Sequence, residues 1–174
     1  MIFLKLLSKL LKALRSNASP KQIAGGFVLG MILGLTPLMS LHNLVVVLII
    51  MLIRVNLSMV FFSFLLCSGI AYLLDPLFLD VGYWTLTGIP FLKGVWTAWY
   101  NTPVIALTRF YNTLVMGSFV VSILLIFPMM PLVQKGVVLY REKIDAKMQK
   151  WKIFKLLKSS KIYTIYNKIS HFGE

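Results

Sequence analysis

The distribution of charge along the chain constrains its fold more than any other feature. Residues 22–134 contain only five charged side chains, which are Arg54, Asp75, Asp80, Lys93 and Arg109. The apolar intervals between them are long enough to be membrane segments. Because 59% of the chain is hydrophobic and only 13% is charged, an ordinary soluble domain is excluded. The pattern predicts an all-α, multi-pass integral membrane protein, with residues 22–134 as its transmembrane domain.

The first apolar interval, residues 23–53, is too long for one straight crossing. As a single helix its 31 residues would reach about 46 Å, whereas a hydrocarbon core is about 30 Å thick. Pro37 removes a backbone donor and disfavours helical geometry at Thr36, so we expect the helix to break there. Each piece is then too short to cross, which favours a re-entrant helical hairpin. A kinked single crossing is the alternative.

Two further segments are predicted to span the membrane. Residues 57–74 carry no charge and are followed by Asp75 and Pro76, which we expect to end the helix. Residues 104–127 form the second span, closed by the prolines that follow it. Residues 75–103 are dense in aromatic residues and helix breakers, which is typical of an outer loop at the membrane interface.

The bias of lysine and arginine predicts which side of the membrane each end faces. Residues 1–21 hold five of the 18 basic side chains and residues 135–168 hold ten. Because basic segments stay on the cytoplasmic side, both termini are expected there, which requires an even number of crossings. The hairpin and the two spans meet this requirement, whereas a kinked single crossing would require residues 91–108 to cross as well.

Both ends of the chain are predicted to be amphipathic surface helices. In residues 1–21 a basic stripe runs among leucines, and in residues 135–174 apolar side chains recur at near-helical spacing beside a row of lysines. Anionic lipid headgroups would attract each nearby basic side chain by about 1 kcal/mol. The formal charge of +13 therefore indicates membrane lipids and not nucleic acid. A soluble docking helix for a protein partner is the alternative for the C-terminal segment.

Gly26, Gly30 and Gly34 recur every four residues, so they lie on one face of the helix that precedes Pro37. Such a glycine zipper allows another backbone to approach closely within a membrane. The three glycines and Pro37 are therefore predicted to serve helix packing. Tight packing against the other hairpin arm or the following helix is favoured over a ligand-binding role.

Arg54, Asn56 and His42 are the candidate residues for binding a lipid headgroup. Polar side chains are costly inside a membrane. Arg54 and Asn56 are expected at the cytoplasmic mouth, where a planar guanidinium suits a phosphate group. The alternatives are that Arg54 snorkels to anchor its helix, and that His42 hydrogen-bonds carbonyl groups freed by Pro37.

The outer loop supplies a second group of candidate contact residues. Trp96 and Trp99 share one helical face and suit the membrane interface. Arg109 lies near the outer end of a predicted span, where an ion pair with Asp75 or Asp80 is expected. We expect these five residues to form a contact surface on the outer side.

Groups that support catalysis or metal binding are scarce. The two histidines, His42 and His171, lie far apart, and the single cysteine, Cys67, is set in an apolar run. These residues do not make a metal site of ordinary ligand number. Acidic side chains lie only near the ends of predicted spans, so paired carboxylates for acid–base catalysis are missing. We therefore expect no metal, no cofactor and no enzymatic activity.

One run of residues resembles the signature of a known family. The run comprises Ser19, Pro20, Ile23, Ala24, Gly26, Phe27, Gly30, Gly34, Pro37 and His42, followed by Arg54, Val55, Asn56 and Leu57. Over about residues 16–75 it is similar to domain of unknown function 2062, a family of bacterial multi-pass membrane proteins without an established activity. The resemblance implies the bacterial inner membrane. For a similar subgroup it implies a gene beside that of a large membrane-anchored protein with a long extracytoplasmic part.

Two functions fit these features. The first is a non-enzymatic accessory or scaffold subunit of a cell-envelope assembly concerned with lipid transport, with the large membrane-anchored protein as its partner. The second is a lipid-binding or lipid-translocating protein that acts itself on an anionic phospholipid or a polyprenyl phosphate. Half-helix ends inside a membrane are known places for substrate binding, which is the physical argument for the second function.

Overall fold

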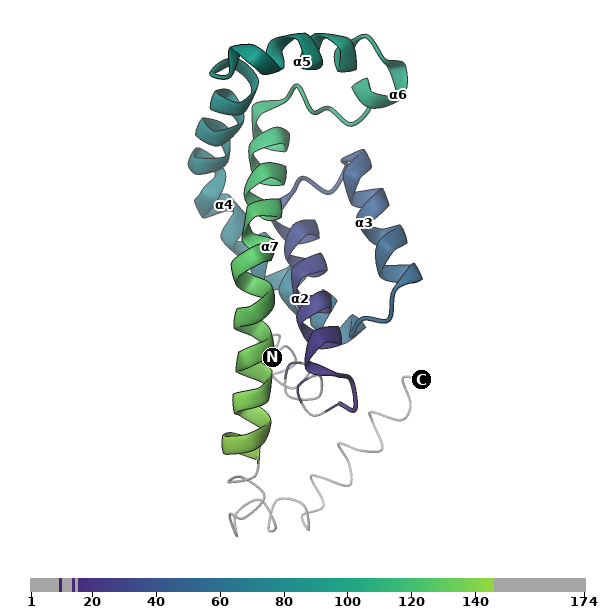
Figure 1. Ribbon diagram of the computed structural model, residues 1–174, viewed down its shortest axis with the longest axis vertical. Helices are drawn as coiled ribbons and strands as arrows, with labels where there is room; N and C mark the ends of the chain where they lie inside the picture. The colour runs from purple at the N-terminus through teal and green to yellow at the C-terminus, as the bar shows by residue number, and fades with distance from the viewer. Residues whose placement is uncertain (1–9, 11–13, 15, 146–174) are drawn as a thin grey trace. The chain divides into compact units, whose positions relative to one another are not determined.

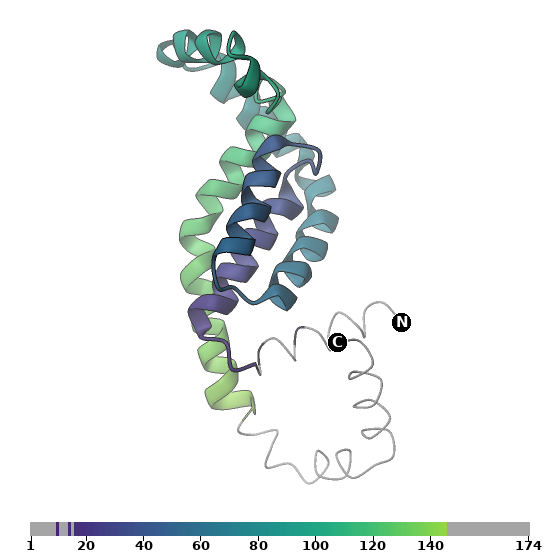
Figure 2. The ribbon, with the colours of Figure 1, turned by 90° about the vertical axis from the view of Figure 1, so that its right-hand side faces the viewer.

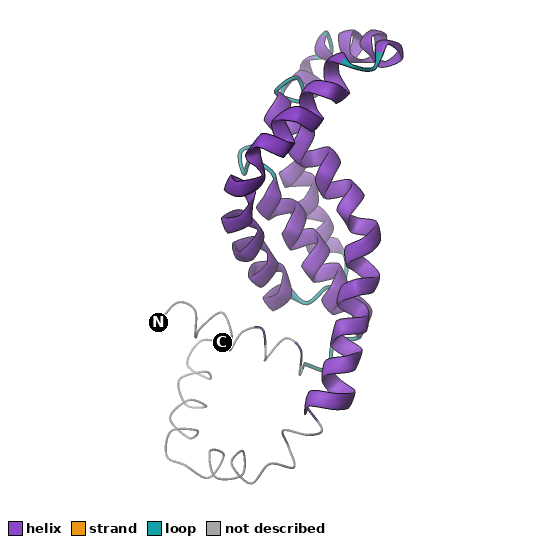
Figure 3. Cartoon of the chain, turned by 90° about the vertical axis from the view of Figure 1, so that its left-hand side faces the viewer, coloured by secondary structure: helices purple, strands orange, loops and turns teal. Residues whose placement is uncertain are grey.

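The computed structural model describes residues 10, 14 and 16–145. In this part of the chain every regular element is a helix and there is no strand (Figure 3), so the all-α class is confirmed. The elements are α2 (Pro20–Leu35), α3 (Leu41–Leu52), α4 (Leu57–Thr87), the 3₁₀ helix η1 (Pro90–Leu92), α5 (Lys93–Tyr100), α6 (Pro103–Ala106), α7 (Thr113–Leu139) and the π-helical η2 (Tyr140–Asp145).

The chain forms two compact units, Met1–Lys135 and Gly136–Glu174. Of the second unit, residues 136–145 are described, and they complete α7 and form η2. The amphipathic surface helices expected at residues 1–21 and 135–174 therefore lie largely outside the described residues.

α2 begins at a capping box. The Ser19 hydroxyl oxygen accepts from the backbone N–H of Gln22 (3.2 Å), and the Gln22 side chain accepts from the backbone N–H of Ser19 (2.8 Å). Pro20 occupies the first helical position, where its missing N–H costs nothing. The sequence therefore fixes the start of α2 just before its apolar residues.

Five non-helical residues, 36–40, separate α2 from α3. The Thr36 hydroxyl lies 2.7 Å from the carbonyl oxygen of Ile32 and 2.8 Å from Oδ1 of Asn43. Nδ2 of Asn43 donates to the carbonyl oxygen of Pro37 (2.9 Å). Thr36 and Asn43 are buried. Asn43 supplies a partner to the Pro37 carbonyl in the break, and the Thr36 hydroxyl links Asn43 to the end of α2, where the Ile32 carbonyl also accepts from the Thr36 N–H.

The chain reverses its direction at this break. Beyond α3, the backbone N–H of Asn56 donates to the carbonyl oxygen of Gln22 in the first turn of α2 (3.2 Å). Figures 1 and 2 show α2 and α3 side by side. Residues 23–53 are therefore two helices that run in opposite directions, and not one straight rod.

α2 packs against the first half of α4 through its glycine face. A Cβ atom added at Gly26 or Gly34 would meet a backbone carbonyl oxygen of the facing segment at 2.6 Å, and one added at Gly30 would overlap that of Val60. The absence of side chains at these positions therefore lets the two backbones lie directly against each other. α4 covers this face of α2 within the chain itself.

A second close approach of backbones joins α4 to α7. A Cβ atom at Gly82 would overlap the carbonyl oxygen of Thr113, and one at Gly117 would overlap that of Phe78. The Phe78 side chain is completely buried. No regular spacing in the sequence marks this pair of glycines. The pair positions the C-terminal half of α4 against α7.

Asp75 and Pro76 do not end the second apolar helix. α4 continues through both to Thr87, so the predicted end at residue 74 is wrong, and residues 75–87 of the predicted loop are helical. An interior proline removes one backbone donor, whereas a helix end leaves up to four carbonyl groups without intrahelical partners. Among apolar side chains the second cost is the larger one.

The bounds predicted for the last span, residues 104–127, are also wrong as helix bounds. α7 begins at Thr113, where Oδ1 of Asn112 accepts from two N–H groups of the first turn (2.9 and 3.2 Å). Pro128 and Pro131 lie inside α7 and do not close it. As at Pro76, an interior proline removes one backbone donor, whereas ending the helix would leave more backbone groups unpaired.

Two helical segments, Leu57–Thr87 and Thr113–Lys143, are long and apolar enough to cross a membrane. Of their most apolar stretches, only 22% and 28% of the residues are buried against the rest of the protein. Such extensive exposed apolar surface is unusual for a soluble monomer and fits the expected membrane location.

The residues between α4 and α7 form an aromatic cluster. Trp96 of α5 donates its indole N–H to the carbonyl oxygen of Thr85 (3.2 Å). The ring centroids of Trp96, Trp99 and Phe110 lie 5.3–6.0 Å apart. In Figures 1 and 2, α5 lies across the end of α4. The predicted outer loop, residues 75–103, is therefore largely helical: its first part belongs to α4, and short helices make up most of the rest.

The Gly30→Ala variant should unfold more easily than the natural protein. Its Cβ would overlap the Val60 carbonyl oxygen, so α2 and α4 must separate, and we expect the free energy of unfolding to fall by about 1–3 kcal/mol. Thermal unfolding followed by circular dichroism in detergent measures the change. Gly69→Ala is the matched control, because nothing lies within 4 Å of a Cβ there. Equal losses in both variants would contradict the packing role of Gly30.

The Asn43→Leu variant should destabilise the break between α2 and α3. It removes the donor to the Pro37 carbonyl and a partner of Thr36, which should cost about 1–3 kcal/mol of unfolding free energy. The same thermal measurement applies, with Asn101→Leu as control, because Asn101 is exposed at the end of α5. If Asn43→Leu melts at the same temperature as the unsubstituted protein, the Asn43 side chain does not stabilise the break.

Candidate functional site

Arg54 and Asn56 occupy the connection between α3 and α4, but only Arg54 is available to a ligand. Arg54 is exposed. Asn56 caps α4: its Oδ1 accepts from the backbone N–H of Met59 (3.0 Å), and its Nδ2 donates to the Ser16 hydroxyl (3.1 Å). Asn56 therefore serves the fold, and of the two neighbours the guanidinium of Arg54 is the group that could meet an anion.

His42 lies at the opposite end of α3 from Arg54. Twelve residues separate them, which is about 18 Å along a helix axis. The structure therefore does not bring His42, Arg54 and Asn56 into one site. The expectation that His42 satisfies carbonyl groups near Pro37 is also wrong, because Asn43 makes that hydrogen bond.

The ring of His42 packs beside Phe119 of α7, with centroids 5.0 Å apart. Its Nε2 atom is buried and has no hydrogen-bond partner in the part of the chain that the structure describes. An unpaired buried polar atom is uncommon and calls for an explanation. His42 is therefore a candidate ligand contact, although in a place different from the one predicted.

Among the outer residues, the structure brings Trp96 and Trp99 together, with ring centroids 5.3 Å apart. Arg109 is exposed in a left-handed backbone conformation with φ of 56°. Within the described residues it makes no ion pair with Asp75 or Asp80. The expected outer surface is thus an aromatic cluster without the predicted ion pair.

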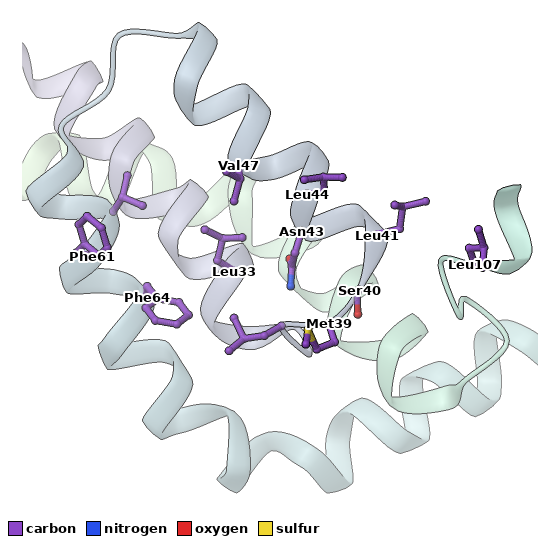
Figure 4. A pocket seen from close by; sticks show the side chains of 12 residues that line it. Leu33, Met39, Ser40, Leu41, Asn43, Leu44, Val47, Phe61, Phe64 and Leu107 are labelled. Carbon is purple, nitrogen blue, oxygen red and sulfur yellow. The ribbon is translucent and has the colours of Figure 1, made fainter.

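An open cavity of about 630 Å³ lies beside the break, between α2, α3 and α4 (Figure 4). Its polar lining consists of Ser40 and Asn43. The other lining side chains are apolar: Leu33, Leu38, Met39, Leu41, Leu44, Val47, Val60, Phe61, Phe64 and Leu107. The side-chain polar atoms of Asn43 already have partners at the break. The cavity therefore offers contact to hydrocarbon and almost no unmet hydrogen bonds.

The cavity is concave and open on the side that α3 and the break present. Leu38 and Met39, at the break, are 62% and 92% exposed, and Leu44 of α3 is 56% exposed. The volume falls within the range of roughly 300–1,000 Å³ that small-molecule sites occupy.

Within the described residues there is no group of three or more histidine, cysteine, aspartate or glutamate side chains that could hold a metal ion. Cys67 is buried against α2, where its Cβ would contact a Cβ added at Gly34. The arrangement therefore suits binding by shape and apolar contact, with Arg54 as the nearby charge.

Sequence comparison extends the resemblance over most of the chain. The sequence model of the family described as an uncharacterized protein conserved in bacteria (DUF2062) matches residues 5–145, which include every described helix. A relative from Treponema pallidum (strain Nichols), itself described only as an uncharacterized protein, is 29% identical over 157 residues, 90% of this chain and 96% of the relative. No solved structure matches the chain. The chain therefore belongs to the DUF2062 family.

Proposed function

We propose that this protein resides in the bacterial inner membrane and holds the hydrocarbon chain of a membrane lipid in the cavity beside the α2–α3 break. The single observation that carries the proposal is the open apolar cavity of about 630 Å³ at that break. It is bounded by α3, whose exposed side chains include Leu44, Val47 and Leu48. A lipid tail is the ligand that such a surface would meet inside a membrane.

In this proposal α2 and α3 form a re-entrant hairpin. Their 16 and 12 residues correspond to about 24 and 18 Å, less than a hydrocarbon core of about 30 Å. Non-helical backbone at that depth is tolerated only where protein or water covers it. Two features of the fold support this arrangement: α4 covers α2, and the side chains of Thr36 and Asn43 satisfy the break.

The proposed orientation places both termini in the cytoplasm. The exposed cations Lys21 and Arg54 lie at the end of the fold where α2 begins, because Asn56 is hydrogen-bonded to Gln22. The aromatic cluster around α5 lies at the opposite end (Figure 1). Positive charge on the cytoplasmic side and aromatic residues at an interface are the usual arrangement of membrane proteins.

Arg54 gives the proposed lipid a preferred charge. It follows α3 in the chain, and Val47, the last cavity residue of α3, lies five residues before the end of that helix at Leu52, which corresponds to about 8 Å along its axis. A phosphate group held by Arg54 could therefore place its hydrocarbon chain in the cavity. An anionic phospholipid or a polyprenyl phosphate has this combination of a charged head and an apolar tail.

A second candidate function is that of an accessory subunit in an envelope assembly that transports lipid. The observation that favours it is the outward face of α3, where Val45, Leu48 and Leu52 are 52%, 49% and 82% exposed at helical spacing. Another membrane helix would fit this face as well as lipid does. The glycine face of α2 is a weaker candidate, because α4 covers it.

Filling the cavity should reduce lipid capture. Val47 lines the cavity, whereas Val45 is exposed on the same helix and does not line it. With a phosphatidylglycerol that carries a photoreactive group in its acyl chain, Val47→Trp should lower cross-linking several-fold, and Val45→Trp should leave it unchanged. Arg54→Gln should lower capture of this anionic lipid but not of a phosphatidylcholine analogue. If Val47→Trp and Val45→Trp cross-link equally, the lipid does not occupy the cavity.

The orientation can be tested by cysteine labelling in a Cys67→Ser background, in which no other cysteine remains. Lys21 and Gly94 are both exposed and lie at opposite ends of the fold. A membrane-impermeant maleimide added outside intact spheroplasts should label Gly94→Cys and leave Lys21→Cys unlabelled until the membrane is opened. Labelling of Lys21→Cys from outside would reverse the proposed orientation.

A further inference from the structure

A second cavity, of about 350 Å³, lies on the other side of α3, between that helix, the outer half of α4, the α5–α6 segment and α7. It is formed by different residues from the first cavity. Five of its lining side chains carry aromatic rings: His42, Trp96, Trp99, Phe110 and Phe119. No charged side chain belongs to its described lining.

Three of the polar side chains around this cavity have hydrogen-bond partners within the protein. The indole N–H of Trp96 donates to the Thr85 carbonyl oxygen (3.2 Å), and the hydroxyls of Thr85 and Thr108 donate to backbone carbonyl oxygens (2.7 Å each). Nε2 of His42 is buried without a partner. A ligand that fits the cavity would thus meet aromatic rings and a buried nitrogen able to form a hydrogen bond.

The chemistry of the lining decides between classes of ligand. A lipid phosphate or carboxylate would find no cation here to balance its charge. A volume of about 350 Å³ lies near the lower end of the range for small-molecule sites, so a two-chain phospholipid would not fit. Aromatic side chains favour stacked or edge-to-face contact with another flat ring. A neutral histidine nitrogen either donates to a carbonyl oxygen or accepts from a hydroxyl.

We propose that this cavity binds the ring of a membrane quinone, with a ring oxygen hydrogen-bonded to Nε2 of His42 and the ring between the Trp96–Trp99 pair and Phe119. The oxidised ring would accept from the Nε2–H tautomer of His42, and the reduced ring would donate to Nε2 of the tautomer that carries its proton on Nδ1, so the two forms differ only in the tautomer they require. This inference rests on its own cavity and does not require the lipid site beside the break.

Fluorescence of the lining tryptophans tests the proposal. In a Trp84→Phe, Trp151→Phe background, only Trp96 and Trp99 of the four tryptophans remain, and both line the cavity. Menadione, a two-ring quinone, added to the full-length protein in nanodiscs should quench this emission saturably. Equilibrium dialysis, with menadione measured by its absorbance, should give the same dissociation constant.

Matched variants separate binding in the cavity from collisional quenching. Val120 lines the cavity and the neighbouring Val121 does not, so Val120→Phe should abolish saturation and Val121→Phe should keep it. His42→Leu should raise the dissociation constant about five- to tenfold through loss of one hydrogen bond. If Val120→Phe does not fold, Ile105→Phe fills the same space from the α6 side.

Three outcomes would overturn the proposal. The first is quenching that does not saturate, or that is equal in Val120→Phe and Val121→Phe. The second is displacement of menadione by an equal concentration of 1-decanol, since a straight chain would then occupy the cavity equally well. The third is an unchanged dissociation constant in His42→Leu. Phospholipid cross-linking to the Val120→Phe variant should equal that to the unsubstituted protein. The proposed lipid site beside the break and the proposed quinone site can therefore be tested independently.

Discussion

Hydrogen bonding at the break between α2 and α3 is the interaction on which the rest of the fold depends. A helix that stops among apolar side chains leaves carbonyl and N–H groups without partners, and each such group is costly when water is absent. Asn43 supplies a partner to the Pro37 carbonyl, and Thr36 connects Asn43 to the last turn of α2. Only then can α3 return along α2, bring Asn56 to Gln22 and leave the open cavity on its flank.

The fold also requires close approach of helix backbones, which occurs at two helix pairs. Gly30 lets α2 lie against the start of α4, and Gly82 with Gly117 lets the outer half of α4 lie against α7. Because helices in a membrane gain little from burying apolar surface, van der Waals contact between such backbones is what holds them together. α4 therefore supports α2, and α7 in turn supports α4.

The sequence was sufficient for the local features and insufficient for those that depend on neighbouring helices. Pro37 acts within one or two turns, so the break could be predicted. The capping residues Ser19 and Gln22 act as locally, yet the predicted apolar interval began only at residue 23 and did not use them. Pro76 obeys the same local rule, yet α4 runs through it, because the cost of ending a helix there is set by surroundings that the sequence does not display. His42 was the predicted partner for the break, whereas Asn43 makes the hydrogen bond to the Pro37 carbonyl, because the direction of each side chain on α3 decides which of them reaches it.

The two cavities show why a short arm with two apolar faces is a useful structure. Residues two apart on a helix point to different faces, so His42 meets Phe119 while Leu44 borders the cavity beside the break. A continuous span of residues 23–53 would carry these side chains away from α2 and leave neither space enclosed. The reversal at the break thus makes one 12-residue helix border two cavities of different chemistry: one is lined almost entirely by apolar side chains, and the other is rich in aromatic side chains.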